Sequence, residues 1–549
     1  MPFAEIGCPL PDLSIVLLLA GVIIVSSVIS RSLPALIPPP LVQIALGYGV
    51  ALFGGFEVEL EPELFLFLFL PPLLFLDAWR IQKRSFYANL KAIINLSLGL
   101  VVFTVLGLGF LLNWLIPAIP LPAAFALAAI LSPTDPVAIS AIARTVPIPR
   151  RLMHILEGES LLNDASGLVC MRFAVAAIAS GTFSLSSAAG NFAWLALSGV
   201  AIGAVLSWFV NRLNYLVTRR IGEDVSTEIV FSLLIPFAAY YLAEKAGGSG
   251  VLAVVAAGLV MSRMEIRHLG LPGTRLRRNA VWDLLQFGLN GAMFIILGEQ
   301  LPHIFRKASE LVGATGHAGA YWLVIYAGLV VLGLIALRFV WVWVSLTLAR
   351  GHQPLRMVLV AGLSGVRGAI TLAGVLSMPL VLDNGQPFPA RDLIIFIAAC
   401  VIILSLLMAC LSMPLALRGL VEDSQPALPE QELQARMKAA NVALDAIEAM
   451  RKEMSSDPAE QVAADISALY SGRLERAKAL IGSPDPAETL QILQAERRIW
   501  LAALHAERIA IQSEVRAHRL TDDVGRTLLH EVDLMEERWL RAMAGRRSA

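Results

Sequence analysis

Gly158-Glu159-Ser160-Leu161-Leu162-Asn163-Asp164 decides how this chain is interpreted, because it places two carboxylates and an amide inside a long apolar segment. A charged side chain at the depth of a bilayer is costly and usually marks a path for ions or protons. Ser132-Pro133-Thr134-Asp135-Pro136 is a second such point, with prolines flanking an aspartate. Together the two stretches predict a transporter whose carboxylates bind a cation and protons in turn.

The composition is that of a membrane protein. Hydrophobic residues make up 57% of the 549 residues and charged residues 16%, and the mean hydropathy is +0.70. The apolar runs are continuous rather than alternating, which favours transmembrane helices over a β-barrel. We therefore expect an all-α polytopic protein in a lipid bilayer. No broad basic surface indicates a nucleic-acid partner, and no HExxH or GxSxG motif indicates an enzyme.

The apolar segments and the loop charges together predict a topology. Arg and Lys gather in alternate loops. For a protein of the cell inner membrane, the positive-inside rule then puts the N-terminus outside and the C-terminal tail in the cytoplasm. We expect about thirteen spans. They are 12–30, 35–53, 60–78, 90–113, 122–143, 152–181, 190–217, 225–246, 250–263, 280–300, 320–348, 355–381 and 391–418.

The tail is a different kind of sequence. We expect a transmembrane domain over residues 1–420 and an α-helical cytoplasmic domain over 421–549, because apolar residues of the tail recur at helical spacing among Ala, Glu, Gln and Arg. Regulation, stabilisation of a dimer and a plain solvated bundle are all open roles for it.

Asp135 lies where a helix is expected to break. Pro133 and Pro136 disfavour a regular helix around it, and broken helices at membrane depth persist where they are buried or line a wet cavity. The functional reading is an ion site built on the break. The structural alternative is a carboxylate that caps a helix end.

Asp164 is the expected centre of the site. A carboxylate in a low-dielectric site can hold a proton or offer hard oxygen ligands to a small cation, and that competition is sufficient for exchange. Asn163 adds an amide beside it, and Ser160 lies one helical turn earlier on the same face.

The other intramembrane charges have competing interpretations. Glu159 lies about 140° around the helix from Asp164, and Arg367 in a glycine-rich stretch is its candidate partner in a structural ion pair. Asp77 either lines a cytoplasmic funnel or is an ordinary interfacial acid. Five more charges are expected to be paired or to reach the interface: Glu157, Glu228, Glu299, Arg172 and Arg338.

In order along the chain, these motifs resemble the monovalent cation:proton antiporter-1 family, the NhaP-type relatives of sodium/proton exchangers. The resemblance covers roughly residues 10–420. It rests on five stretches in order: Pro71-Pro72-Leu73-Leu74-Phe75 with Asp77, Thr134-Asp135-Pro136, Glu159-Ser160-Leu161-Leu162-Asn163-Asp164, residues 250–259 from Gly250 to Leu259, and Gly365-Val366-Arg367-Gly368-Ala369-Ile370.

The resemblance implies an inverted-repeat fold with a dimerisation domain, a mobile core domain and two broken, crossing helices at spans five and twelve. It implies a homodimer that exchanges one sodium, or lithium, for one proton without net charge movement and without a cofactor. Asp164 would be the cation and proton carboxylate, with Asp135, Ser160 and the backbone at Thr134 completing a monovalent cation site.

Further roles follow from the same resemblance. The Asn163-Asp164 pair would mark the electroneutral branch, Asp77 would lie at the cytoplasmic funnel, and Glu159 and Arg367 would form the structural ion pair. Glu299 departs from the family pattern and leaves room for a second protonatable site.

Three alternatives stay open from sequence. One is potassium/proton exchange by the same mechanism, since selectivity depends on site geometry. The others are a cation channel and an antiporter-like sensor whose output is the tail.

Overall fold

Helices form the framework of the protein, and among the described residues eight of them are long and apolar enough to cross a membrane. The all-helical fold predicted from composition is confirmed, while the number of thirteen spans stays a prediction. This computed structural model describes residues 10–33, 37–54, 61–135, 150–180, 185–222, 224–267, 272–314, 321–348, 355–382, 387–417, 430–453, 457–482, 486–517 and 519–547.

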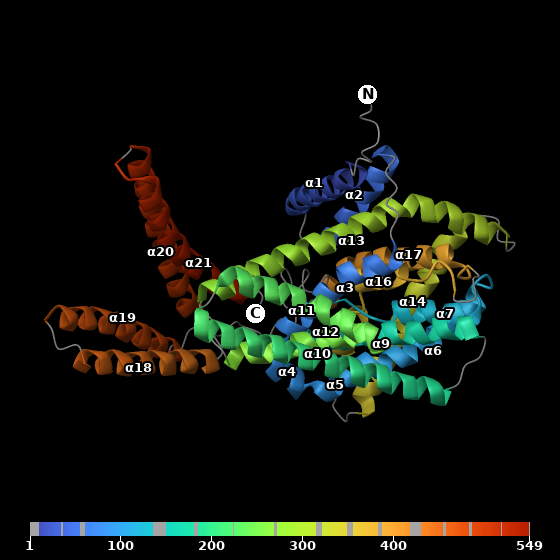
Figure 1. The fold of residues 1–549 in the computed structure, drawn as a ribbon, viewed down its shortest axis with the longest axis horizontal. Coiled ribbons are helices and arrows are strands. Elements are labelled where there is room, and N and C mark those ends of the chain that lie inside the picture. Colours follow the sequence, from blue (N-terminus) through green and yellow to red (C-terminus); the bar gives the residue numbers. More distant parts are fainter. Residues whose placement is uncertain are drawn as a thin grey trace. The chain divides into compact units, whose positions relative to one another are not determined.

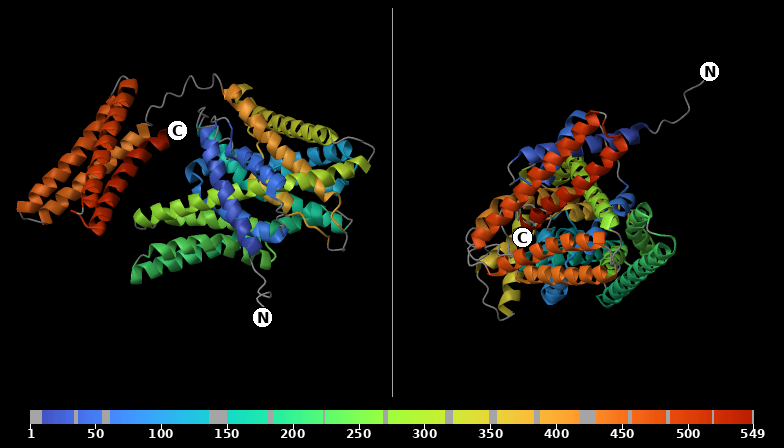
Figure 2. Two further views of the ribbon diagram at one scale, coloured as in Figure 1. Left: turned by 90° about the horizontal axis from the view of Figure 1, so that it is seen from above. Right: turned by 90° about the vertical axis from the view of Figure 1, so that its left-hand side faces the viewer.

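The chain divides into two compact units, Met1–Arg418 and Gly419–Ala549. Within the first unit the contacts between described helices group them into two bundles, whose helices are drawn in Figures 1 and 2. We call the first the scaffold bundle; it holds α1 (Leu10–Ser32), α2 (Pro39–Gly54), α3 (Pro62–Arg80), α10 (Leu185–Ile221), α11 (Val225–Lys245), α12 (Gly250–Arg267) and α13 (Pro272–Ala314).

We call the second the core bundle. Its described elements are α4 (Lys83–Ala88), α5 (Leu90–Ile94), the π-helix η1 (Asn95–Gly99), α6 (Leu100–Leu115), α7 (Leu121–Leu131), α9 (Arg150–Ser180), α14 (Tyr321–Leu348), α15 (Leu355–Leu363), α16 (Ala369–Leu376) and α17 (Arg391–Leu417). The bundles touch where α13 meets α17 and where α3 meets α16.

Small residues hold the scaffold bundle tightly together. Gly199, Gly203 and Ser207 recur every four residues on α10, facing α12, and a Cβ at Gly203 would collide with the backbone of Ala253. Ser207 Oγ donates to the carbonyl of Ala257 at 2.9 Å. Between membrane helices such close backbone approach supplies the packing that the hydrophobic effect does not.

Burial differs sharply between the helices. The apolar window of α17 is 72% buried, whereas that of α1 is 6% buried. The centre of the core bundle is therefore built on α17, and α1 presents its apolar surface to lipid or to a partner.

The second unit consists of α18 (Glu430–Glu453), α19 (Asp457–Gly482), α20 (Pro486–Arg516) and α21 (Asp522–Arg547). Figure 1 shows α18 beside α19 and α20 beside α21, as their contacts require. Trp500 stacks on Trp539 with ring centroids 5.4 Å apart, and Arg508 pairs with Asp533 at 2.6 Å. The tail is thus helical, as its apolar spacing predicts.

Candidate functional site

Two interruptions of helices meet in the core bundle. Helix α7 ends at Leu131 and the chain stays non-helical through Asp135, while a non-helical stretch separates α15 from α16, which begins at Ala369. The Asp135 N–H donates to the Val366 carbonyl at 2.7 Å, so the two interruptions are bonded to each other. This is the break predicted in span twelve, and the first half of the one predicted in span five; the rest of span five lies outside the described residues.

Each helix end at this junction faces a charge that complements it. Arg367 Nε donates to the carbonyl of Leu131 at 2.9 Å, at the C-terminal end of α7. Asp135 Oδ2 accepts from the N–H of Ala369 at 3.3 Å, at the N-terminal end of α16. Helix C-termini carry partial negative charge and N-termini partial positive charge, and both leave backbone groups unpaired. Asp135 therefore does cap a helix end, which was the structural alternative for it.

Gly368 makes this cap possible, and its substitution is expected to destabilise the junction. A Cβ at Gly368 would overlap the carboxylate of Asp135. We expect Gly368→Ala to lower stability by about 1–3 kcal/mol, the usual cost of overpacking. Gly328→Ala is the matched control, since a Cβ there meets nothing within 4 Å. Thermal unfolding in detergent measures both, and equal midpoints for the two variants would show that Asp135 moves aside without cost.

Helix α9 carries the polar residues of the site against the junction. Its close approach depends on Gly167, where a Cβ would lie 2.8 Å from the carbonyl of Ala129. Ser160, Asn163 and Asp164 lie on this helix and are buried, with 6%, 1% and 3% of their surface exposed. Backbone contact at the glycine therefore brings three polar side chains to the broken helices.

A chain of hydrogen bonds links α9 to the first interruption. Asn163 Nδ2 donates to Thr134 Oγ1 at 3.0 Å, and Thr134 Oγ1 donates to Glu159 Oε1 at 3.1 Å. The hydroxyl of Thr134 therefore bonds the first interruption to α9. Asn163 Oδ1 is buried and accepts no hydrogen bond from the described residues, which leaves it open to a ligand, because buried carbonyl oxygens are normally paired.

The ion pair predicted between Glu159 and Arg367 is wrong. Glu159 pairs with Arg338 of α14 instead, through Nη1 to Oε1 at 2.5 Å and Nη2 to Oε2 at 2.9 Å. The side chains of the pair are 1% and 3% exposed. A bidentate pair buried this deeply fixes structure, so the role predicted for Glu159 is kept but its partner changes.

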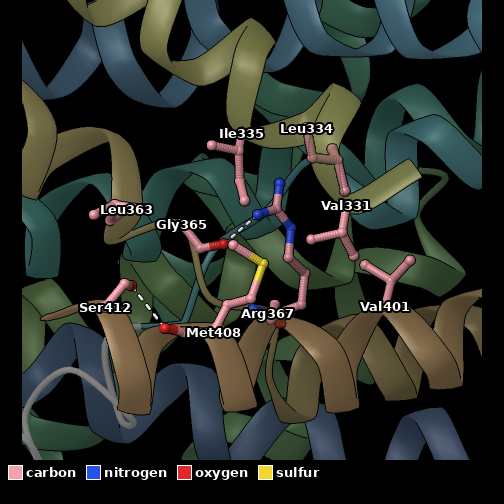
Figure 3. A pocket seen from close by; sticks show the side chains of 10 residues that line it. Val331, Leu334, Ile335, Leu363, Gly365, Arg367, Val401, Met408 and Ser412 are labelled. Atoms are coloured by element: carbon pink, nitrogen blue, oxygen red, sulfur yellow. Dashed lines mark hydrogen bonds between the residues drawn. The ribbon is translucent and has the colours of Figure 1, made fainter. Parts of the chain in front are cut away.

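The physical reason is that the guanidinium of Arg367 forms its hydrogen bonds with backbone carbonyl groups. Its guanidinium donates to the Leu131 carbonyl at the end of α7 and to the Gly365 carbonyl within the second interruption. Figure 3 shows it pointing toward Gly365, in a narrow cavity lined by α14 residues such as Val331 and by Met408 of α17. Because Arg367 lies within the interrupted helix, the nearest acceptors for its guanidinium are backbone carbonyl groups that the interruption leaves unpaired.

Arg338 is the residue that sequence reasoning undervalued. Besides Glu159 it binds Ser364 Oγ at 3.2 Å and, through Nε, the carbonyl of Ala361 at 2.8 Å near the end of α15. One guanidinium thus joins α9, α14 and the second interruption. The available signal was an arginine in a long apolar run, whereas the glycine-rich stretch around Arg367 had favoured that residue as the partner.

Asp164 interacts with other acidic side chains. It interacts electrostatically with Asp135, Asp77 and Glu159. Among the described residues no donor forms a hydrogen bond with its carboxylate. A buried carboxylate without donors is costly when ionised, so a proton or a cation would be bound favourably there.

Asp77 has the exposure that a funnel residue needs. Phe75, Leu76 and Ala78 beside it on α3 are almost completely buried, whereas Asp77 is exposed. Its charge is close enough to Asp135 to interact with it. The acidic residues Asp77, Asp135 and Asp164 therefore form one group that extends from the buried site to the surface.

Glu299 lies apart from this group. It is on α13 in the scaffold bundle, beside a cavity that it lines with Ile15 and Leu18 of α1 and Val50 of α2. The structure therefore does not bring it together with Asp164.

Known proteins match this chain in sequence and in fold. Residues 15–419 match the family described as the transmembrane sodium/hydrogen exchanger. The chain is 40% identical over 539 residues to a protein of Escherichia coli K12 named "Uncharacterized Na(+)/H(+) exchanger YjcE", covering 95% of this chain and 97% of that protein. It is 37% identical to the "Sodium, potassium, lithium and rubidium/H(+) antiporter" of Bacillus pumilus, covering 95% and 77%.

A solved structure has the same fold. The sodium proton antiporter MjNhaP1 from Methanocaldococcus jannaschii at pH 8 superposes with a TM-score of 0.59 over 75% of this chain and 100% of that chain, at 18% identity. That identity supports a shared fold. The family match spans most of the chain, and this protein therefore belongs to the sodium/hydrogen exchanger family.

Proposed function

We propose that this protein exchanges sodium for protons across the membrane, with both ions competing for Asp164. The observation that carries the proposal is the pair of open oxygen groups on α9. The carboxylate of Asp164 is buried without a hydrogen-bond donor among the described residues, and next to it Asn163 Oδ1 is buried and unpaired. Carboxylate and amide oxygens are hard ligands suited to a small cation.

The coupling follows from the cost of an empty site. When Asp164 is ionised and unoccupied, its charge lies in apolar surroundings beside other acids, which is unfavourable. A bound sodium or a bound proton removes that cost. We propose that the core bundle moves readily only when loaded, with Asp135, Ser160 and the backbone at Thr134 completing the site in the transported state, and Asp77 attracting cations toward it.

The exchange is proposed to be electroneutral. One carboxylate that holds either one sodium or one proton carries no net charge across in either direction, because its neighbour Asn163 is neutral. Glu299 is in the other bundle and is not expected to take part.

A flux measurement tests this stoichiometry. Proteoliposomes loaded with a pH dye receive sodium, lithium or potassium in turn, with and without a clamped membrane potential. We expect a sodium-driven proton flux whose rate is unchanged by the potential. A flux that follows the potential would contradict one-for-one exchange and point to a second proton carrier.

Potassium/proton exchange is the second candidate, and one observation favours it. The Bacillus pumilus relative is named as an antiporter of sodium, potassium, lithium and rubidium. In the same assay a potassium response at least equal to the sodium response would replace sodium as the preferred substrate while leaving the mechanism at Asp164 intact.

We further propose a homodimer in the cell inner membrane with the tail on the cytoplasmic side. The Arg and Lys residues of alternate loops support this orientation. Protease access to residues 430–547 in right-side-out and inverted vesicles tests it, since cleavage in right-side-out vesicles would reverse the orientation. Light scattering of the purified protein tests the dimer, and a monomeric mass would contradict it.

A further inference from the structure

A bidentate ion pair joins the two bundles of the membrane unit. Arg172 of α9, in the core bundle, donates to Glu244 of α11, in the scaffold bundle, through Nη2 at 2.8 Å and Nη1 at 3.2 Å. Glu244 is itself held in place, because its Oε1 accepts from the N–H of Gly250 at the start of α12 at 2.9 Å. The arginine therefore binds a fixed acceptor that belongs to the other bundle.

The pair lies at one end of the membrane unit and Asp77 lies toward the other. Tyr240 interacts with Arg172 and with Glu63 at the start of α3, so these residues mark one end. Asp77 is near the far end of the same helix α3, which ends at Arg80. On α9, Arg172 is two turns beyond Asp164 on the side away from Asp77.

The two ends of the ion site therefore differ. Toward Arg80 lies the exposed carboxylate of Asp77, which interacts electrostatically with Asp135 and Asp164. Toward Arg172 the core helix α9 is clamped to α11. The described residues thus place an exposed carboxylate on the Arg80 side of the site and the ion pair on the opposite side.

We propose that Arg172 and Glu244 form a latch that keeps the site closed at their end, and that the pair separates each time that end opens. The inference rests on the proposed alternating access, in which the core bundle moves against the scaffold bundle. Bonds of 2.8 and 3.2 Å across the moving boundary do not survive such a displacement, because hydrogen bonds weaken steeply with distance and angle.

The exposure of the pair suits a bond that must break repeatedly. The side chains of Arg172 and Glu244 are 38% and 31% exposed, so both charges regain water when they separate. The Glu159–Arg338 pair has 1% and 3% exposure and lies within the core bundle, where its rupture would leave buried charges unpaired. A partly exposed pair stabilises one state modestly, which biases the equilibrium without trapping it.

The opposite end has a weaker link between the bundles. The ammonium of Lys83 on α4 donates to the carbonyl of Ser262 on α12. This bond has one neutral partner and a flexible side chain, so it follows small movements more easily than the bidentate pair.

A sidedness measurement tests the latch. Glu244→Gln removes the charge pair, and sodium is presented to one face at a time in right-side-out and inverted vesicles while proton flux is recorded. We expect the ratio of the two half-saturating sodium concentrations to shift about two- to fivefold in favour of the face near Arg172, which is the shift that a partly exposed pair supports. The charge-exchanged variant Arg172→Glu with Glu244→Arg is expected to move the ratio back toward the wild-type value, although an arginine at position 244 cannot accept the hydrogen bond from Gly250.

Asp283→Asn is the matched control. It breaks the Arg80–Asp283 pair of 2.6 Å, which joins α3 and α13 within the scaffold bundle, and should leave the ratio unchanged. An unchanged ratio in Glu244→Gln, or an equal shift in the control, would overturn the latch. If wild-type protein showed no exchange at all, the proposed function would fail instead.

A cross-link provides a second readout if Glu244→Gln folds poorly. Arg172→Cys and Glu244→Cys, in a chain whose native cysteines are replaced by alanine, are joined by a short bis-methanethiosulfonate reagent, which forms a reducible disulfide with each cysteine. We expect exchange to stop on cross-linking and to return with reductant, while each single cysteine variant stays active. Continued exchange in the cross-linked protein would contradict the latch.

Discussion

Asp164→Asn is expected to abolish cation-driven proton flux while leaving the protein as stable as the wild type or more so. The amide cannot exchange a proton and cannot neutralise a bound cation, so both half-reactions lose their common site. Stability should not fall, because no described residue donates a hydrogen bond to this carboxylate and its charged neighbours Asp135 and Asp77 are repulsive. Flux in proteoliposomes and thermal unfolding in detergent measure the two effects.

Two further variants, Asp164→Glu and Ser160→Ala, are compared with Asp164→Asn. Asp164→Glu keeps the exchangeable group, and Ser160→Ala removes a neutral oxygen while leaving the carboxylate in place. We expect both to retain flux at a raised half-saturating sodium concentration. Full flux in Asp164→Asn would show that another acid carries the ions.

Glu159→Gln is expected to destabilise the protein by about 3–5 kcal/mol, the cost of leaving one partner of a buried ion pair uncompensated. Arg338 would remain buried with its charge unpaired, since its side chain is 3% exposed. The double variant Glu159→Gln with Arg338→Met removes both charges at similar volume and should regain part of that stability, because methionine also leaves the Ala361 carbonyl without its donor. Thermal unfolding of the single and double variants measures the coupling.

The same experiment distinguishes the two arginines. Arg367 caps the Leu131 carbonyl rather than pairing with Glu159, so Glu159→Gln with Arg367→Met should be less stable than Glu159→Gln alone. Rescue by the Arg367 variant and not by the Arg338 variant would restore the pair expected from sequence and contradict the observed one.

The sequence was sufficient for the architecture because membrane burial leaves strong local signals. Long apolar runs predict the spans, and the glycines from Gly365 to Gly368 correctly predict an interrupted helix between α15 and α16. Asp135 could be predicted to lie at a break but not to cap α16, since its partner Ala369 is 234 residues away.

The sequence could not predict which arginine pairs with Glu159. Glu159 and Arg338 are 179 residues apart, and two arginines in apolar runs were equally available to that carboxylate. The choice between them depends on which carbonyl groups the broken helices leave unpaired, a property of the folded junction. The unpaired oxygen of Asn163 also became evident only once its nitrogen was seen to bind Thr134.

Proton release on sodium binding tests most directly whether cation and proton compete for Asp164. Purified protein in detergent and weak buffer, with a pH dye, is titrated with sodium at a pH where the site is protonated. We expect about one proton released per sodium bound, because one carboxylate holds one or the other, and no release in Asp164→Asn. Sodium binding to the wild type without proton release, or equal release from Asp164→Asn, would contradict competition at this residue.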